Sequence, residues 1–389
     1  MTDDLRPETT AIRAGRAHDG ASLAPVLWPS TTYRLDDLDR ARELNFAARP
    51  PDFYGRNGSP TVNEFADAVA ALEGAEAALA LGSGMGALST IVFALCSAGD
   101  HIVAQHRTFS VTNQLLTMVC PRFGIDVTFV DATDVGAVEA AVEPGRTMLV
   151  IVETPANPGL DVIDLAAIGQ IAGPFTVVDS TMATPVVQRP LEHGIDLVMH
   201  AATKGIAGHN DAMLGVVAGE QELIDVVWRH HLVHGAVASA YDSWNGLRGL
   251  RTLHARVRQQ SASAAVLADR LADHASVASV RYPGRGDHPH RDIAARQMEN
   301  GGTIVAFDLA GGADVGAELL RRCRLVLSAA SFGGPETLIT HPASTTAATL
   351  SPDDRAAMGI GDGTIRLSVG LEHVEDLWDD LDAALGGVD

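Results

Sequence analysis

The sequence predicts an α/β protein with a mostly parallel sheet and a second, smaller α+β domain. From residue 75 onward, short apolar runs alternate with segments of helical periodicity. Near-continuous apolar strands separated by helices are typical of a parallel sheet that is covered on both faces. The chain has 389 residues, 46% of them hydrophobic, which is enough for a large core and more than one domain. A long helix predicted over residues 241–260 separates this sheet from a later group of strands.

We expect three parts: an N-terminal arm over residues 1–55, a large domain over 56–240 and a C-terminal domain over 241–389. In the arm only residues 35–44 have the pattern of a helix, because prolines interrupt the rest. A long segment without a core of its own usually wraps a neighbouring domain or subunit. The interrupting prolines are Pro7, Pro25, Pro29, Pro50 and Pro51.

The first predicted helix of the large domain has clear boundaries. Ser59 is placed as its N-cap, Pro60 as its first residue and Gly74 as its end. The strands that follow are predicted at residues 77–80, 102–104, 127–130, 148–152, 176–178, 197–199 and 213–217. The helices predicted between them include residues 86–96, 109–120 and 165–171. In the C-terminal domain a helix is predicted at 261–272 and strands at 277–282, 302–308, 324–327 and 365–369.

The composition argues against several classes of protein. A formal net charge of −21 disfavours nucleic-acid binding, which depends on clustered lysine and arginine. No apolar run approaches the roughly 18 residues that a bilayer span needs. The N-terminal MTDDLRPETT is too polar for a signal peptide, so we expect a cytoplasmic protein with no membrane partner.

The residues that commonly bind metals occur in no metal-binding pattern. The 3 cysteines are widely spaced, which disfavours disulfides and a cysteine-ligated zinc site. His230, His231 and His234 lie close together but lack the HExxH pattern. We therefore expect no metal site.

Two side chains that could carry chemistry follow predicted strands. Lys204 comes just after the apolar run 197–199, so it lies at the carboxyl end of a strand, where open α/β sheets bind their ligands. An amine in such a partly dry crevice has a lowered pKa and can attack a carbonyl to form a Schiff base. Asp179 ends the strand 176–178 and could pair with a protonated ring nitrogen. A solvated surface lysine and a helix-capping aspartate are the alternative interpretations.

Three further features fit a ligand site. Residues 82–86, Gly-Ser-Gly-Met-Gly, follow a strand and open a helix, which is the arrangement that binds phosphate through backbone N–H groups. Asn157 lies between prolines after the strand 148–152, and its amide could donate to a ligand oxygen. Arg366 alternates with apolar residues on its strand and could pair with a substrate carboxylate. An ordinary glycine turn, an ordinary polar turn and a surface salt bridge remain possible for the three features respectively.

Together these parts fit pyridoxal 5′-phosphate (PLP). This cofactor needs a lysine for its aldehyde, a carboxylate for its pyridine nitrogen and a cup for its phosphate. Lys204, Asp179 and the glycine-rich loop supply these three groups, and Arg366 would read the carboxylate of an amino acid.

Long segments also resemble one enzyme family along nearly the whole chain. They are FYGRNGSPT, ALEGAE, GSGMGA, AGDHIV, VETPANP, VVDSTMATPVVQRPLEHGIDLVMHAATKGIAGHND, DSWNGLRGLRTL, SFGGPETLITHPAS and TIRLSVGLEHVEDL. The chain resembles the cystathionine γ-synthase-like group, the Cys/Met-metabolism PLP enzymes of fold type I. That resemblance implies a large domain with a seven-stranded sheet and a smaller C-terminal α+β domain.

The resemblance implies a role for each candidate residue. Lys204 would be the Schiff-base lysine and Asp179 the partner of the pyridine nitrogen. Asn157 would hydrogen-bond the cofactor and the substrate, and Arg366, assisted by Ser331, would bind the substrate α-carboxylate. The residues implied around the rest of the cofactor are Ser83, the backbone of Gly84 and Met85, Thr181 and Thr203.

The resemblance also implies an oligomer. Tyr54 and Arg56 match residues that reach the cofactor phosphate of a neighbouring subunit. This match would explain a wrapping arm, and it implies a homotetramer built from dimers with shared active sites.

Three positions depart from the family pattern. Phe109 stands where a tyrosine usually stacks on the cofactor, so the ring can stack but has no phenol. Some relatives, similar to O-succinylhomoserine sulfhydrylases, also have phenylalanine there. Ala201 replaces a serine, which removes one phosphate hydroxyl. Ala330 stands where cystathionine-handling members tend to have glutamate, which suggests a substrate with an uncharged distal end.

The hypothesis from the sequence is a PLP-dependent enzyme that acts on an L-amino acid with a leaving group on its γ carbon. We favour γ-elimination, as in cystathionine and methionine γ-lyases, with γ-replacement by a synthase or sulfhydrylase as the close alternative. Phe109 and Ala201 leave a further alternative, a PLP-binding subunit or regulator without catalysis. A metal-dependent or nucleotide-binding enzyme is disfavoured because its motifs are absent from the sequence.

Overall fold

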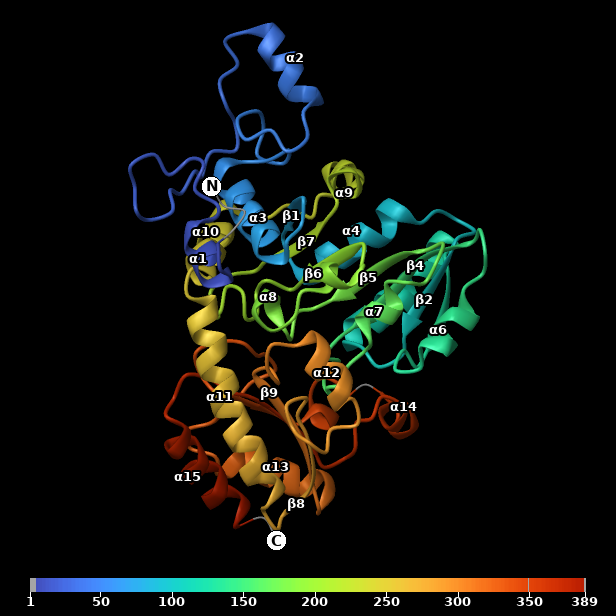
Figure 1. Ribbon diagram of the computed structural model, residues 1–389, viewed down its shortest axis with the longest axis vertical. Helices are drawn as coiled ribbons and strands as arrows, with labels where there is room; N and C mark the ends of the chain where they lie inside the picture. The colour runs from blue at the N-terminus through green and yellow to red at the C-terminus, as the bar shows by residue number, and fades with distance from the viewer. Residues whose placement is uncertain (1–4, 349, 388–389) are drawn as a thin grey trace.

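The computed structural model describes residues 5–348 and 350–387, which form two sheets with helices packed on them (Figure 1). The first sheet comprises β1 (Ala77–Leu81), β2 (His101–Gln105), β3 (Asp126–Val130), β4 (Thr147–Glu153), β5 (Phe175–Asp179), β6 (Leu197–His200) and β7 (Gly215–Gly219). The second comprises β8 (Val277–Arg281), β9 (Ile304–Leu309), β10 (Leu327–Ser328), β11 (Leu338–Thr340) and β12 (Thr364–Ser368). The α/β fold class is therefore confirmed.

The helices of the arm and the large sheet precede residue 251. They are α1 (Pro7–Arg13), α2 (Leu38–Phe46), α3 (Pro60–Glu73), α4 (Gly84–Leu95), α5 (Ser110–Gln114), α6 (Val135–Ala141), α7 (Leu165–Ile168), α8 (Thr184–Val187), α9 (Gln221–His234) and α10 (Ala240–Leu250). The later helices are α11 (Leu253–Ala272), α12 (Arg291–Gln297), α13 (Gly312–Arg322), α14 (Pro352–Ala357) and α15 (Val374–Leu385). Short 3₁₀ segments occur at Cys120–Phe123, Pro190–His193 and Pro342–Ser344.

The strand order of the large sheet brings four loops to one edge. Its order is β1-β7-β6-β5-β4-β2-β3, in which β7 runs antiparallel to both of its neighbours and the remaining pairs are parallel. As a result β1, β4, β5 and β6 all point in the same direction. The loops that follow them meet at the carboxyl edge of the sheet, which is where sheets of this kind bind ligands.

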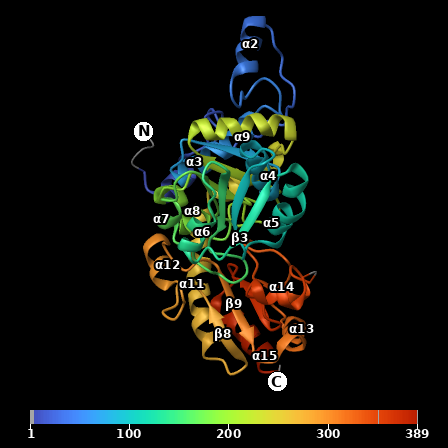
Figure 2. The same ribbon diagram turned by 90° about the vertical axis from the view of Figure 1, so that its right-hand side faces the viewer.

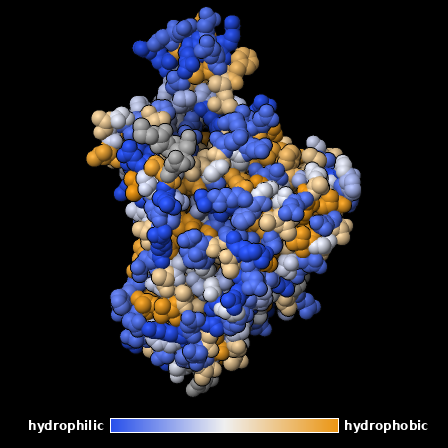
Figure 3. Space-filling view, viewed as in Figure 1, coloured by the Kyte–Doolittle hydropathy of each residue, from blue (hydrophilic) through white to orange (hydrophobic). Residues whose placement is uncertain are grey.

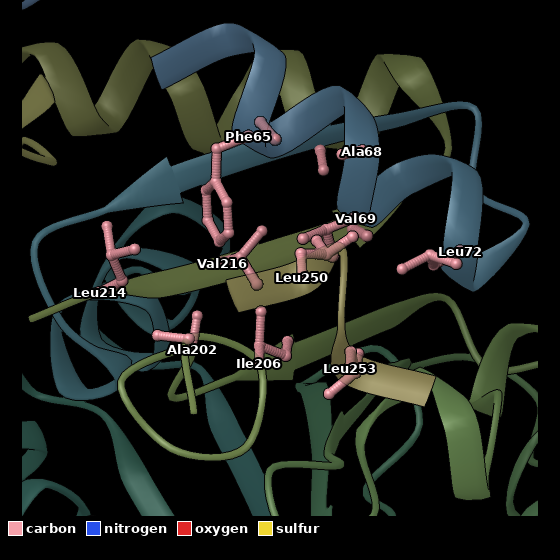
Figure 4. Packing of buried hydrophobic residues seen from close by; sticks show 14 of the residues in the cluster. Phe65, Ala68, Val69, Leu72, Ala202, Ile206, Leu214, Val216, Leu250 and Leu253 are labelled. Atoms are coloured by element: carbon pink, nitrogen blue, oxygen red, sulfur yellow. The ribbon is translucent and has the colours of Figure 1, made fainter. Parts of the chain in front are cut away.

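Helices bury both faces of this sheet, as its nearly continuous apolar strands predicted. On one face Phe65 and Val69 of α3 pack against Val216 of β7 and Leu250 of α10 (Figure 4). On the other face, α4 and α9 bury their apolar residues against the alternate side chains of the strands. The smaller sheet has a separate core, with α11, α13 and α15 packed on it.

The predicted start and end of α3 are confirmed. The hydroxyl of Ser59 accepts a hydrogen bond from the N–H of Val62, and Pro60 is the first helical residue. Gly74 ends the helix with a φ of 70°, a left-handed conformation that glycine adopts without a Cβ clash.

The prediction for the arm was wrong in one respect, because α1 forms within the part predicted to be irregular. Pro7 is the first residue of this helix, Glu8 lies in its first turn and Arg13 in its last. Proline is well tolerated at that position, and the two charges complement the helix dipole. The predicted helix at 35–44 forms as α2, shifted by a few residues, and projects from the rest of the chain (Figures 1 and 2).

Some boundaries elsewhere also differ. The segment predicted as one helix at 109–120 begins as α5 and continues as a π-helical turn over Leu115–Val119. The strand predicted at 213–217 forms at β7, two residues later, and that at 324–327 forms as the short β10. Strand β11 was missed.

The helix predicted over 241–260 is wrong as a single element. It breaks between α10 and α11, where Thr252 leaves the helical conformation. α11 continues to Ala272 and extends along the C-terminal part, so it takes the role of the predicted spine (Figure 1). The domain boundaries at residues 55 and 240 stay a prediction.

A buried arginine connects the break between α10 and α11 to the loop after Lys204. Arg256 of α11 is 5% exposed and donates to the carbonyl oxygens of Gly205 (2.9 Å), Ile206 (3.2 Å) and Gly249 (2.8 Å). Burial lowers its pKa to about 10. Because buried carbonyl groups need donors, this side chain links the spine to the loop at the sheet edge.

Replacing this arginine should destabilise the protein. In Arg256→Met the carbonyls of Gly205 and Ile206 lose this donor, while that of Gly249 keeps its bonds from Thr252, so the free energy of unfolding should fall by about 3 kcal/mol. Arg258→Met is the matched control two residues away, because Arg258 is mostly exposed and pairs with Glu8, and its loss should cost less than about 1 kcal/mol. Denaturant unfolding measures both, and equal losses would contradict the role given to Arg256.

Within residues 5–348 and 350–387, the helices are all too short or too polar to cross a bilayer. The surface carries apolar residues on the arm: in the space-filling view, hydrophobic side chains interrupt the hydrophilic surface of the projecting part (Figure 3). Leu38 and Phe46 of α2 are 85% and 81% exposed.

Candidate functional site

A pocket of about 210 Å³ opens at the carboxyl edge of the large sheet. It lies where the loops after β1, β5 and β6 meet, so it occupies the place predicted for a ligand. Its lining includes the predicted residues Ser83, Gly84, Met85, Phe109, Asp179, Ala201, Thr203 and Lys204.

Lys204 lies in the turn that follows β6. Its backbone N–H donates to the carbonyl of Ala201, and its Nζ donates to Oγ of Ser331 at 2.9 Å. The ammonium also lies 5.0 Å from the ring centroid of Phe332. Burial, and to a smaller extent the positive charge of Arg366, lower the pKa of this amine, which favours its neutral, nucleophilic form.

Asp179 is the last residue of β5, and Thr181 in the following turn binds its carboxylate. Its Oδ1 accepts from the backbone N–H of Thr181 at 3.0 Å and from the hydroxyl of the same residue. That hydroxyl in turn accepts from the N–H of Ala201 at 2.8 Å. Burial raises the pKa of Asp179, while the two bonds from Thr181 act in the opposite direction. A cationic ring nitrogen beside it would stabilise the ionised form.

The glycine-rich loop forms an anion cup. Ser83 caps α4, since its Oγ accepts from the N–H of Gly86 at 2.9 Å, and the first N–H groups of the helix have no intrahelical acceptor. A Cβ at Gly84 would lie 2.6 Å from the Cβ of Ala201, and one at Gly215 would lie 2.0 Å from the carbonyl oxygen of Ser83. Glycine is therefore required at both positions for the loop and the strands to approach this closely.

Thr203 lines the same pocket. Its hydroxyl donates to the carbonyl of Leu214 at 3.1 Å and accepts from the N–H of Leu214 at 2.8 Å. These bonds join the turn that carries Lys204 to the start of β7.

Arg366 lies across from Lys204 on β12 of the smaller sheet. It is 3% exposed and donates to Oδ1 of Asn157 (3.0 Å) and to the carbonyl of Ser331 (2.9 Å). Its buried Nε has no partner, and among the described residues no carboxylate lies within ion-pair distance of it. Burial lowers its pKa to about 10. A buried guanidinium in this state fits an anionic ligand group such as a carboxylate.

The structure does not place Tyr54 and Arg56 in this pocket. Tyr54 is 42% exposed, and the guanidinium of Arg56 lies 5.2 Å from its ring centroid. Arg56 instead lines a separate cavity of about 230 Å³ with Arg49 and His231. Ala330 is exposed and directly precedes Ser331, which binds Lys204.

Several lining residues were missed by the sequence analysis. Leu88, Thr112, Met199 and Met213 also face the pocket. Thr112 follows Phe109 by three residues on a helical segment, a spacing that could have indicated a shared face. The methionines gave no signal, because an apolar residue near a strand end is usually part of the core.

Comparisons with known proteins agree with this geometry. The model of the family described as Cys/Met metabolism PLP-dependent enzyme matches residues 8–386. The chain belongs to this family. An L-methionine gamma-lyase of Fusobacterium nucleatum is 39% identical over 384 residues, which cover 97% of each chain. An O-succinylhomoserine sulfhydrylase of Pseudomonas aeruginosa is 38% identical over 385 residues, covering 98% of this chain and 95% of the relative.

A solved structure confirms the fold of the family. The crystal structure of metB from Corynebacterium glutamicum has a TM-score of 0.92 and 31% identity, with 100% of both chains covered. The protein is thus a PLP-dependent enzyme of Cys/Met metabolism with the type I fold. The pocket fits this cofactor, because Lys204 and Asp179 both line it, and the half-buried Lys204 has no carboxylate within ion-pair distance among the described residues.

The lowered pKa of Lys204 gives a pH prediction. Only the neutral amine attacks an aldehyde, so covalent capture of PLP by the apoprotein should reach half its maximal rate below the pH of about 10.4 typical of lysine. In Arg366→Gln a positive neighbour is lost, so the pKa of Lys204 should rise and the midpoint should move to higher pH. Stopped-flow absorbance across pH measures both, with Arg258→Gln as the control. An unchanged or lower midpoint in Arg366→Gln would contradict this electrostatic coupling.

Proposed function

We propose that this protein is a γ-lyase that removes the γ substituent from a γ-substituted L-amino acid, with release of a 2-oxo acid and ammonia. The observation that carries the proposal is that the half-buried Lys204 and the buried Arg366 both lie close to the ring of Phe332, in a chain 39% identical to an L-methionine gamma-lyase. The two cations would have separate tasks with an amino-acid substrate. Lys204 would act near the α carbon, and Arg366 would hold the carboxylate.

The residues around the pocket would hold the cofactor. Lys204 would bind it covalently, and Asp179, oriented by Thr181, would pair with its pyridine nitrogen. Phe109 would stack on its ring, and Asn157 would donate to its phenolic oxygen. The residues that would hold its phosphate are Ser83, Gly84 and Met85 through their backbone, and Thr203. When bound, PLP supplies an electron sink for negative charge that develops beside the substrate α carbon.

The remaining residues of the chain would bind the substrate and move protons. Arg366 binds the α-carboxylate, with Ser331 and Asn157 beside it. Nζ of Lys204, once free and neutral, would take the α proton, release it again and then take the β proton, and Ser331 is within reach to orient it. Phe109 has no ionisable group, so proton transfer depends on Lys204.

The close alternative is γ-replacement, in which a thiol adds after the γ substituent leaves. A relative 38% identical is an O-succinylhomoserine sulfhydrylase, and Phe109 is compatible with such a reaction. The exposed Ala330 beside Ser331 favours a substrate with an uncharged distal end in either case. A PLP-binding subunit without catalysis is the alternative from another class, which Phe109 and Ala201 favour.

The assembly proposed with this function is a cytoplasmic homotetramer made of dimers with shared active sites. The projecting arm supports it, because Leu23, Leu38 and Phe46 are more than 80% exposed at 86%, 85% and 81%. Large apolar side chains in such a segment are usually covered by a partner. Tyr54 and Arg56 at the base of the arm would then reach the phosphate site of the neighbouring subunit.

One assay series tests the function and its alternatives. The purified holoprotein would be offered methionine, cystathionine, homocysteine and O-acyl homoserines, each with and without an added thiol. We expect release of a 2-oxo acid in the absence of thiol and little change when it is added. A new thioether in the presence of thiol would favour replacement, and no turnover of any substrate would favour the inactive subunit.

Substitutions at the two cations should separate their tasks. Lys204→Ala should leave no borohydride-fixed pyridoxyl mass on this position and abolish turnover. Arg366→Lys keeps the charge but not the fork, so KM for the amino acid should rise about tenfold to a hundredfold, the equivalent of one or two lost charged hydrogen bonds. Mass spectrometry and steady-state kinetics measure these effects. Because Lys204 is the only lysine in the sequence, a wild-type holoprotein that keeps no pyridoxyl mass on Lys204 after borohydride treatment would overturn the assignment.

A further inference from the structure

A second buried carboxyl lies beside Asp179. Glu153 is the last residue of β4, 4% exposed, and it is the register partner of Asp179 in the parallel pair β4–β5. Since side chains on paired strands alternate together, both carboxyls point to the same face of the sheet. Burial, and then the charge of Asp179, raise the pKa of Glu153 well above its ordinary value. Placing a second acid here is costly, so it requires an explanation.

The two oxygens of Glu153 bind two different loops. Oε2 accepts from the backbone N–H of Phe109 at 2.7 Å, and Oε1 accepts from the backbone N–H of Asn157 at 2.7 Å. The first N–H belongs to the loop after β2 and the second to the loop after β4. One side chain therefore sets the distance between the residue proposed to stack on the cofactor and the residue proposed to bind its phenolic oxygen.

A neighbouring glutamine holds Glu153 and the same loop in place. Oε1 of Gln105 accepts from the backbone N–H of Glu153 at 2.8 Å, and Nε2 of Gln105 donates to the carbonyl of Arg107 at 2.8 Å. Arg107 precedes Phe109 by two residues, so the loop is fixed on both sides of its turn.

The contacts continue from Glu153 to the substrate side of the pocket. Oδ1 of Asn157 accepts from Arg366, Arg366 donates to the carbonyl of Ser331, and Oγ of Ser331 accepts from Nζ of Lys204. The charge of Glu153 also acts on Arg366, because it partly offsets the fall in the pKa of this guanidinium caused by burial. A shift of the Glu153 carboxyl would thus change the position of the Phe109 ring and the position of Arg366.

We propose that Glu153 is a positioning residue for the reaction: its carboxyl fixes Phe109 over the cofactor and Asn157 between the cofactor and Arg366. This inference rests on the proposed function. The role requires a side chain that carries two acceptor oxygens and is long enough to reach both loops, because the two N–H groups come from separate loops.

The test compares Glu153→Gln with the wild-type holoprotein. Glutamine offers one acceptor oxygen and an amide that donates, so one backbone N–H loses its acceptor. We expect full PLP content, an altered visible circular dichroism of the bound cofactor, and kcat lowered about tenfold to a hundredfold, as expected for a misplaced catalytic group. The spectroscopic readout needs no substrate, so it tests Glu153 even if the wild-type protein turns over no amino acid and the proposed function fails.

Asp380→Asn is the matched control. Asp380 also accepts from backbone N–H groups, those of Arg324, Leu325 and Val326, but it lies in the C-terminal part away from the pocket. Its substitution should lower thermal stability while the visible circular dichroism, kcat and KM stay at wild-type values.

A second variant keeps the inference testable if Glu153→Gln does not fold. In Gln105→Ala the acceptor of the Glu153 N–H is lost, so the circular dichroism should change in the same direction with a smaller amplitude. Glu153→Asp, which is too short to reach both loops, should not restore the wild-type signal. The proposal is overturned if the Glu153 and Gln105 variants lose only thermal stability and keep the wild-type spectrum, kcat and KM per bound cofactor.

Discussion

Two positive side chains that meet at one aromatic ring determine the character of this site. Nζ of Lys204 lies 5.0 Å and the guanidinium carbon of Arg366 lies 5.3 Å from the ring centroid of Phe332. Neither cation has a carboxylate within ion-pair distance among the residues that the structure describes. Like charges placed close together in a partly dry pocket lower each other's pKa, and they attract anionic ligands. The pocket is therefore suited to a phosphate-bearing cofactor and an amino-acid carboxylate.

The backbone brings these cations together from separate sheets. Lys204 follows β6 of the large sheet, whereas Arg366 belongs to β12 of the smaller one. Their approach depends on α11, whose Arg256 binds the carbonyls of the loop after Lys204, and on the loop of Ser331, which contacts both cations. A polar network of this kind holds a geometry more narrowly than apolar packing does, because each bond has a preferred length and direction.

The acids of the site are arranged by the same sheet edge. Asp179 and Glu153 end adjacent parallel strands and are register partners, yet their hydrogen bonds differ. Asp179 is held by Thr181 from the next turn, while Glu153 is held by two loops. The two neighbouring carboxyl groups thus bind different partners, and the loops that reach them decide the difference.

The sequence by itself determined the fold class, the strands of the large sheet and the residues after them. Apolar runs and their terminal Asp179 and Lys204 are local signals, because burial of both faces of a strand and the turn that ends it depend on neighbouring residues. The capped start of α3 and the glycine-rich loop before α4 were predicted for the same reason. Family resemblance added Ser331 and Thr203, whose roles no local pattern indicated.

The tertiary structure alone decided which of these residues meet. At the break before α11, Arg256 donates to carbonyls of a loop that lies 51 and 50 residues earlier in the chain. The unpaired state of the Arg366 Nε, the two bonds of Glu153 and the pocket-facing methionines likewise result from packing between distant segments. Contacts of that kind leave no periodic pattern in the sequence, because neither partner is chosen by its own neighbours.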